Sequence, residues 1–98
     1  AAAAVEHFRE AVRVDPGHVE AQKELGIALA ASGDMAGARA ALERALERDP
    51  ELADAQAMLG LVARSQGDLA LAARHLEAAQ RLAPGDERIA AALADVRR

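Results

Sequence analysis

Apolar residues recur along the chain at intervals of three and four, the spacing that places side chains on one face of an α-helix. Leu25, Ala28 and Leu29 fall on one such face, and Leu42 and Leu46 fall on another. The pattern stops and restarts five times. It therefore predicts six helices, over residues 2–14, 18–32, 35–48, 52–66, 69–82 and 86–97.

The interruptions carry residues that end and start helices. Gly33-Asp34 and Gly67-Asp68 each stand between two periodic stretches. Glycine tolerates the left-handed backbone that follows a helix end, and aspartate accepts hydrogen bonds from the free N–H groups of the next helix. The prolines mark the other turns, because proline lacks an N–H and cannot sit inside a helix.

The whole pattern repeats. Pro16, Pro50 and Pro84 are 34 residues apart, and residues 19–52 laid over residues 53–86 give twelve identities without a gap. We therefore expect residues 1–98 to form a single domain made of half a repeat, two full repeats and a further half, over residues 1–18, 19–52, 53–86 and 87–98.

Small residues recur where helices should cross. Gly26 and Gly60 occupy equivalent positions inside predicted helices, where glycine costs up to about 1 kcal/mol relative to alanine. Their repetition indicates a packing reason, the close approach of a neighbouring backbone. A single helix pair cannot cover its own apolar face, so each pair is expected to stack on the next.

Composition narrows the function classes. Hydrophobic residues make up 52% of the chain and aromatic residues 1%, a balance typical of alanine- and leucine-rich helices. The formal net charge of -4 argues against nucleic acid and against anionic membranes. No apolar run approaches the roughly 18 residues that membrane insertion needs. We expect a soluble protein, cytoplasmic or periplasmic, with no disulfide because cysteine is absent.

With these features the sequence resembles the tetratricopeptide repeat, a 34-residue helical hairpin. The resemblance is carried by two matching sets: Leu25, Gly26, Ala38, Leu42, Ala45 and Pro50, and Leu59, Gly60, Ala72, Leu76, Ala79 and Pro84. It implies an all-α fold, a right-handed superhelical solenoid of stacked antiparallel helix hairpins. Where the family often has aromatic residues, this chain has Gln22, Gln56, Leu29 and Ala63, so we expect a lighter core.

The resemblance also implies a mode of action. In such arrays the first helix of each pair forms a concave wall, and a peptide or helix of a partner protein binds there. The family positions that face this groove carry a mixture of acidic, basic and apolar residues here: Glu20, Lys23, Ile27, Asp54, Leu61, Arg64, Arg88 and Asp95.

Some members of the family clamp a partner's C-terminal carboxylate between Lys, Asn and Arg side chains. Lys23 and Arg88 stand at two clamp-like positions, but Ile27, Met58 and Ala92 stand at the others. We therefore expect two solvated cations rather than a clamp. Arginines enriched in the second half could still steer an acidic partner.

Two alternatives to partner binding remain. Val5, Phe8 and Val12 form an apolar stripe on the first predicted helix, which lacks a pair. A homodimer or further repeats would cover this stripe, or Phe8 would pack on the next hairpin. The less favoured alternative is the helical arm of an enzyme.

The chain itself carries no pattern that indicates catalysis, a metal or a cofactor. His7 and His75 occupy equivalent places in units two apart, too far from one another to share a metal, and His18 stands in a turn between units. All three histidines are expected at the surface. Glu6/Glu10 and Glu43/Glu47 lie at helical spacing among arginines, which predicts solvated faces. Neither Ser32 nor Ser65 has a histidine in register.

Overall fold

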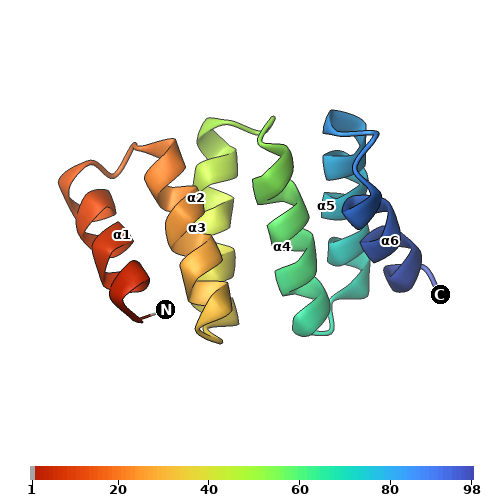
Figure 1. The fold of residues 1–98 in the computed structure, drawn as a ribbon, viewed down its shortest axis with the longest axis horizontal. Helices are drawn as coiled ribbons and strands as arrows, with labels where there is room; N and C mark the ends of the chain where they lie inside the picture. Colours follow the sequence, from red (N-terminus) through yellow and green to blue (C-terminus); the bar gives the residue numbers. More distant parts are fainter. Residues whose placement is uncertain (1) are drawn as a thin grey trace. The chain divides into compact units, whose positions relative to one another are not determined.

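The computed structural model describes residues 2–98 and shows six helices joined by short turns (Figure 1). They are α1 (Ala2–Val14), α2 (Val19–Ala31), α3 (Met35–Arg48), α4 (Ala53–Ser65), α5 (Leu69–Leu82) and α6 (Glu87–Val96). The six predicted helices are confirmed. Their bounds differ by at most one residue, because some predicted ends are capping residues, as His18, Leu52 and Asp86 are.

The described residues form two compact units, which divide between Pro50 and Glu51. In the first unit, α2 and α3 make an antiparallel hairpin and α1 packs on α2. In the second, α4 and α5 make the hairpin, and α6 packs mainly on α5 and also touches α4. The assignment of all residues to one domain, with the repeat boundaries given above, stays a prediction.

The turn inside each hairpin follows the expected chemistry. Gly33 and Gly67 have φ angles of 93° and 81°, in the left-handed region where a side chain would be strained. The next residue then caps the following helix. The Asp34 carboxylate accepts a hydrogen bond from the backbone N–H of Gly37 at 2.8 Å, and Asp68 accepts one from Leu71 at 3.2 Å.

The two helices of each hairpin cross at a glycine. A Cβ atom added to Gly26 would lie 2.6 Å from Cγ of Leu42, and one added to Gly60 would lie 2.7 Å from Cγ of Leu76. Both distances are far shorter than a van der Waals contact between carbon atoms. The packing reason expected for the repeated glycine is therefore confirmed in both hairpins.

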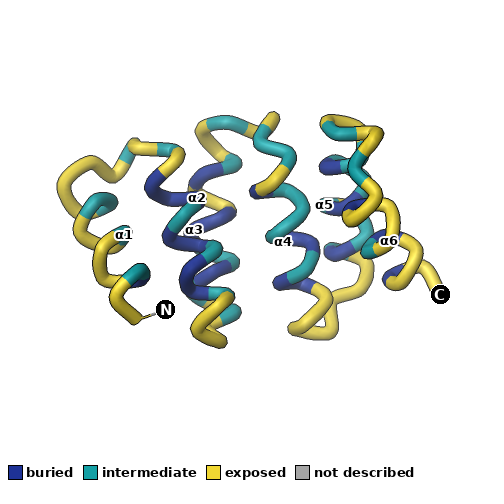
Figure 2. The backbone as a smooth tube through the Cα atoms, in the orientation of Figure 1, coloured by how far each residue is buried: buried dark blue, intermediate teal, exposed yellow. Residues whose placement is uncertain are grey.

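Leucines from facing helices fill the core of each unit, and alanines let the helices come close. Leu42 and Leu76 are fully buried on the second helix of their hairpins, with Leu25 and Leu59 buried on the first. In the second unit Leu93 of α6 joins the same cluster as Leu76. Figure 2 shows the buried stretches along the helices and the exposed residues at the turns.

Replacement of Gly60 by alanine tests the crossing. We expect Gly60→Ala to lower the free energy of unfolding, because overpacking against Leu76 costs about 1–3 kcal/mol while the gain in helix propensity is at most about 1 kcal/mol. Urea denaturation followed by circular dichroism measures the difference. Gly85→Ala is the matched control, since a Cβ there meets nothing within 4 Å. Equal stability of the two variants would contradict the crossing.

Candidate functional site

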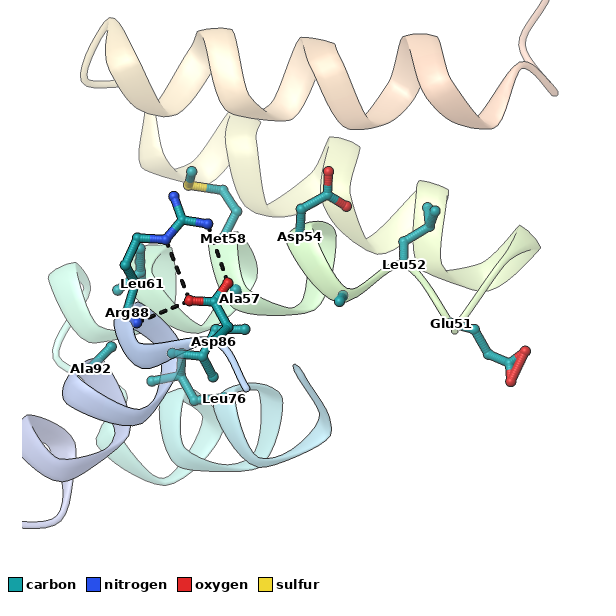
Figure 3. Close-up of a pocket in the computed structure, with 12 residues that line it drawn as sticks. Glu51, Leu52, Asp54, Ala57, Met58, Leu61, Leu76, Asp86, Arg88 and Ala92 are labelled. Carbon is teal, nitrogen blue, oxygen red and sulfur yellow. Dashed lines mark hydrogen bonds and ion pairs between the residues drawn. The ribbon is translucent and has the colours of Figure 1, made fainter. Parts of the chain in front are cut away.

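The second unit contains an open cleft of about 510 Å³ between the first turns of α4 and α6 (Figure 3). α4 and the turn before it form one wall, and α6 forms the other. The lining residues are Glu51, Leu52, Ala53, Asp54, Ala57, Met58, Leu61, Leu76, Asp86, Arg88, Ile89 and Ala92.

Most of this lining is apolar. Leu76 of α5 lies at the base and is fully buried. Met58 and Leu61 contribute half-buried side chains from α4, and α6 contributes the buried Ile89 and the half-buried Ala92. A cleft with an apolar base and half-exposed walls can take up apolar side chains of a ligand and remove them from water.

Charged residues lie where the two helices begin. Glu51 and Asp54 stand at the start of α4 and are exposed. Asp86 and Arg88 stand at the start of α6, and Figure 3 shows their side chains turned toward one another. The mouth of the cleft therefore carries three carboxylates and one guanidinium group, a formal charge of -2.

Asp86 does two things at once. Its Oδ1 accepts a hydrogen bond from the backbone N–H of Arg88 at 2.9 Å, which caps α6. The same carboxylate meets the Arg88 guanidinium at 3.4 Å through Oδ1 and at 3.2 Å through Oδ2. The hydrogen bond from the Arg88 guanidinium is the main reason why the pKa of Asp86 lies below its ordinary value. The same interaction raises the pKa of Arg88.

A further ion pair joins the two walls near their C-terminal ends. Nη1 of Arg64 on α4 lies 3.8 Å from Oδ2 of Asp95 on α6. Arg98 also approaches Asp95, at 3.2 Å. Each predicted groove cation of this unit thus has a carboxylate of the same unit as its neighbour.

The groove residues predicted in the second unit fall around this cleft. Asp54, Leu61 and Arg88 line it, and Arg64 pairs with Asp95 across the same two helices. Whether these residues bind a partner stays a prediction.

Several lining residues did not stand out in the sequence. Asp86 had a usable signal, because an aspartate directly before a helix is a capping residue. Ile89 gave none beyond helical periodicity, which marks a core position equally well. Met58 and Ala92 stand out in the sequence only as positions that depart from the carboxylate clamp.

The predicted groove residues of the first unit lie on α2. Glu20 is exposed and Ile27 is half-buried. The expectation of a solvated cation at Lys23 is wrong, because Lys23 is only 7% exposed. Its Nζ lies 2.6 Å from Oε2 of Glu20 and 3.6 Å from Oε1 of Glu24, so a pair of neighbouring carboxylates neutralises the buried ammonium.

The apolar stripe of α1 is partly covered. Val5 is buried, while Phe8 and Val12 are half-buried on a helix that packs on α2. The Phe8 ring also meets the ring of His7 edge to face, with centroids 5.1 Å apart. Self-association through these residues stays a prediction.

The histidines have structural partners. His7 and His18 are exposed, as expected, and Nδ1 of His18 accepts a hydrogen bond from the N–H of Ala21 at 3.1 Å, which caps α2. His75 was expected at the surface like the other two but is only half exposed, and its Nδ1 lies 2.8 Å from Oε1 of Gln56. Over residues 2–98 no three His, Asp or Glu residues gather closely enough to hold a metal ion.

The serines and the paired glutamates, which were the other candidates for catalysis, also lack a catalytic arrangement in the described residues. The hydroxyl groups of Ser32 and Ser65 donate to backbone carbonyls of their own helices, at 2.9 and 2.8 Å. Both carboxylate pairs, Glu6/Glu10 and Glu43/Glu47, are exposed as expected.

None of the helices described here combines the length and the apolar character needed to cross a membrane.

The sequence matches the family model of the tetratricopeptide repeat over residues 1–53 and 24–87. The chain belongs to the tetratricopeptide repeat family. The expected fold class, an all-α solenoid of helix hairpins, is thereby confirmed. No curated protein matches the chain in sequence.

Solved structures show the same fold. A crystal structure of MamA matches with a TM-score of 0.89 and 29% identity, over 94% of this chain and 54% of that chain. The second TPR domain of human RPAP3, in complex with an HSP70 peptide, matches with a TM-score of 0.89 and 18% identity, over 96% and 78%.

The Yersinia enterocolitica secretion chaperone SycD, in complex with a peptide of the translocator YopD, matches with a TM-score of 0.87 and 18% identity, over 95% of this chain and 76% of that chain. The present chain spans about half the length of the MamA chains that it matches. At 18% identity, the likeness to RPAP3 and SycD shows the fold alone.

The Asp86–Arg88 pair makes a pH-dependent prediction. Because its pKa is lowered in the folded protein, the Asp86 carboxylate stabilises the fold above the ordinary carboxyl pKa of about 4. That contribution is lost as the pH falls through the lowered pKa. We expect Arg88→Gln to lower the Tm at neutral pH and to have no effect once Asp86 is protonated.

NMR titration of the Asp86 carboxyl group measures its pKa directly. The pKa of Asp86 should rise toward its ordinary value in Arg88→Gln. It should stay unchanged in Arg81→Gln, which removes an exposed arginine from α5. An Asp86 pKa that does not respond to loss of Arg88 would show that the pair does not form in solution.

Proposed function

We propose that this chain is a protein-interaction module that binds an extended or helical segment of a partner protein in the cleft between α4 and α6. The observation that carries the proposal is the open apolar cleft of about 510 Å³ between the first helices of successive repeats. This volume lies within the range of ligand-binding clefts, and only a few side chains of a partner would fill it.

The relatives support this mode of action. RPAP3 and SycD are seen with peptides of other proteins. The repeat fold presents successive first helices side by side, so a partner segment can contact several repeats at once. The same mode of binding is proposed for this chain, with its own residues at the contact.

We also propose that the chain has no catalytic activity of its own. The serine hydroxyls are engaged by helix carbonyls, and the paired glutamates are exposed to water. Proton transfer in an active site needs a carboxyl group that is set apart from solvent.

A charge placed inside the cleft tests the proposed site. Peptides selected from a random display library on the wild-type protein should bind Leu61→Asp at least tenfold more weakly, because a carboxylate desolvated by an apolar ligand is costly. Isothermal titration calorimetry measures the affinities. Leu69→Asp is the matched control, since Leu69 is an exposed leucine outside the cleft, at the start of α5.

Two outcomes separate binding from folding. The milder Leu61→Ala should retain the Tm more closely and still weaken binding, since it removes only the apolar contact. Peptides that bind Leu61→Asp and Leu61→Ala as tightly as wild type would move the site away from this cleft, and a library that yields no binding peptide would argue against the proposed function.

A further inference from the structure

A second, smaller pocket of about 300 Å³ lies on the hairpin of α4 and α5. One of its lining residues belongs to α4 and the others to α5: Gln56, Arg74, His75, Glu77, Ala78 and Arg81. We call it the arginine pocket. It shares no lining residue with the cleft between α4 and α6, and its lining is mainly charged and polar where that of the cleft is mainly apolar.

Helical spacing places the two arginines of this pocket on one side of α5. Arg74, Ala78 and Arg81 are separated by four and then three residues, so they lie on the same face of the helix. Both arginines are exposed, and the half-buried alanine between them is too small to fill the space. Along the helix axis the Cα atoms of the arginines are about 10 Å apart. The two guanidinium groups can therefore contact two separate acidic groups of one ligand.

The carboxylate that could neutralise these arginines is engaged elsewhere. Glu77 lies three residues after Arg74 and four before Arg81, which is the spacing of ion pairs within a helix. Its Oε2 atom instead contacts Nη2 of Arg97, at the end of α6. Over residues 2–98, neither Arg74 nor Arg81 has a carboxylate at ion-pair distance. The packing of α6 on α5 thus diverts Glu77 and leaves both arginines uncompensated.

The arginine pocket is consequently positive on a chain whose formal net charge is -4. Its lining carries two arginines and one glutamate, and Arg97 compensates the glutamate, which leaves a formal charge of +2. The groove cations differ in this respect, because Arg64 faces Asp95 and Arg88 faces Asp86. A local positive region attracts a short anionic ligand, whereas the negative charge of the whole chain disfavours a long polyanion such as nucleic acid.

We propose that the arginine pocket binds an acidic segment of a partner protein in which two carboxylate side chains are two residues apart. In an extended segment such side chains point the same way and lie about 7 Å apart, a distance that two flexible arginines on one helix face can match. Guanidinium groups also bind carboxylates through paired hydrogen bonds. This site is additional to the cleft and does not depend on the proposed function. The acidic partner suggested by the arginine content of the second half is thereby assigned to α5 and not to the groove.

Two synthetic peptides test the site. One alternates glutamate with glycine over six residues, and the other has glutamine in place of each glutamate. In NMR titrations we expect the glutamate peptide to shift the backbone amides of His75 and Ala78. It should bind about fivefold more tightly than the glutamine peptide, with an affinity that falls as the salt concentration rises.

Variants with opposite expected effects sharpen the test. The double substitution Arg74→Gln with Arg81→Gln should weaken binding of the glutamate peptide about three- to tenfold, since each exposed ion pair contributes little alone. Glu77→Gln should strengthen binding, because the pocket then loses its lining carboxylate. The matched control is Arg9→Gln with Arg44→Gln, which removes the same charge from exposed positions on α1 and α3 and should leave the affinity unchanged. Glutamine has a helix propensity close to that of arginine, so circular dichroism should show the same helix content in all these variants.

Three outcomes would overturn the arginine pocket as a site for acidic segments. The first is an equal loss of affinity in the two double variants, and the second is equal binding of the glutamate and glutamine peptides. The third is tighter binding of a single-stranded oligonucleotide than of the glutamate peptide at the same amides.

A cleft variant separates this site from the proposed function. Leu61→Ala, which is expected to weaken binding in the cleft, should leave the affinity for the glutamate peptide unchanged. A loss of affinity in Leu61→Ala, together with unchanged affinity in the Arg74/Arg81 variant, would assign the acidic peptide to the cleft and remove the second site.

Discussion

The fold depends on how closely two helices can approach one another inside each hairpin. Gly26 and Gly60 leave room for the leucine of the facing helix, at a distance that a single added carbon atom would close. In a chain with almost no aromatic residues, the core has to be filled by leucine and alanine, and these small side chains fill it only when the backbones are near. The glycine therefore costs helix propensity locally and allows Leu42 and Leu76 to be fully buried.

The small size of the side chains also shapes the cleft. Ala57 and Ala92 stand on facing walls, and small residues there leave the space that a larger side chain would fill. The base is closed by Leu76, the residue that also packs against Gly60. The second unit thus uses one leucine both to hold the hairpin together and to provide an apolar surface at the bottom of the cleft.

Equivalent positions in the two repeats have different surroundings. Gln22 and Gln56 are identical in the alignment, and both lie on the first helix of a hairpin. Oε1 of Gln56 lies 2.8 Å from Nδ1 of His75, whereas Oε1 of Gln22 is buried without a hydrogen-bond partner. The difference has a simple cause, because the place of His75 is taken by Ala41 in the other repeat. Comparison of repeats therefore predicts backbone position more reliably than the hydrogen bonds of a side chain.

The amino-acid sequence by itself determined the number of helices, their ends and the position of each crossing. These features depend on interactions that are local along the chain: helical periodicity, the Asp34 and Asp68 caps, the left-handed Gly33 and Gly67, and the 34-residue repeat. A prediction from residue types alone can reach them for that reason.

Only the tertiary structure determined which charged side chains are buried or paired and where the cleft opens. The spacing of residues predicts Lys23 in water, but Lys23 is buried and pairs with Glu20 and Glu24, and its burial depends on how α2 packs. Ile89 and Ala92 likewise become cleft residues because α6 lies against α5 and α4. Burial and ion pairing depend on groups that are distant in sequence and brought together by packing, so they appear only once the helices have been placed.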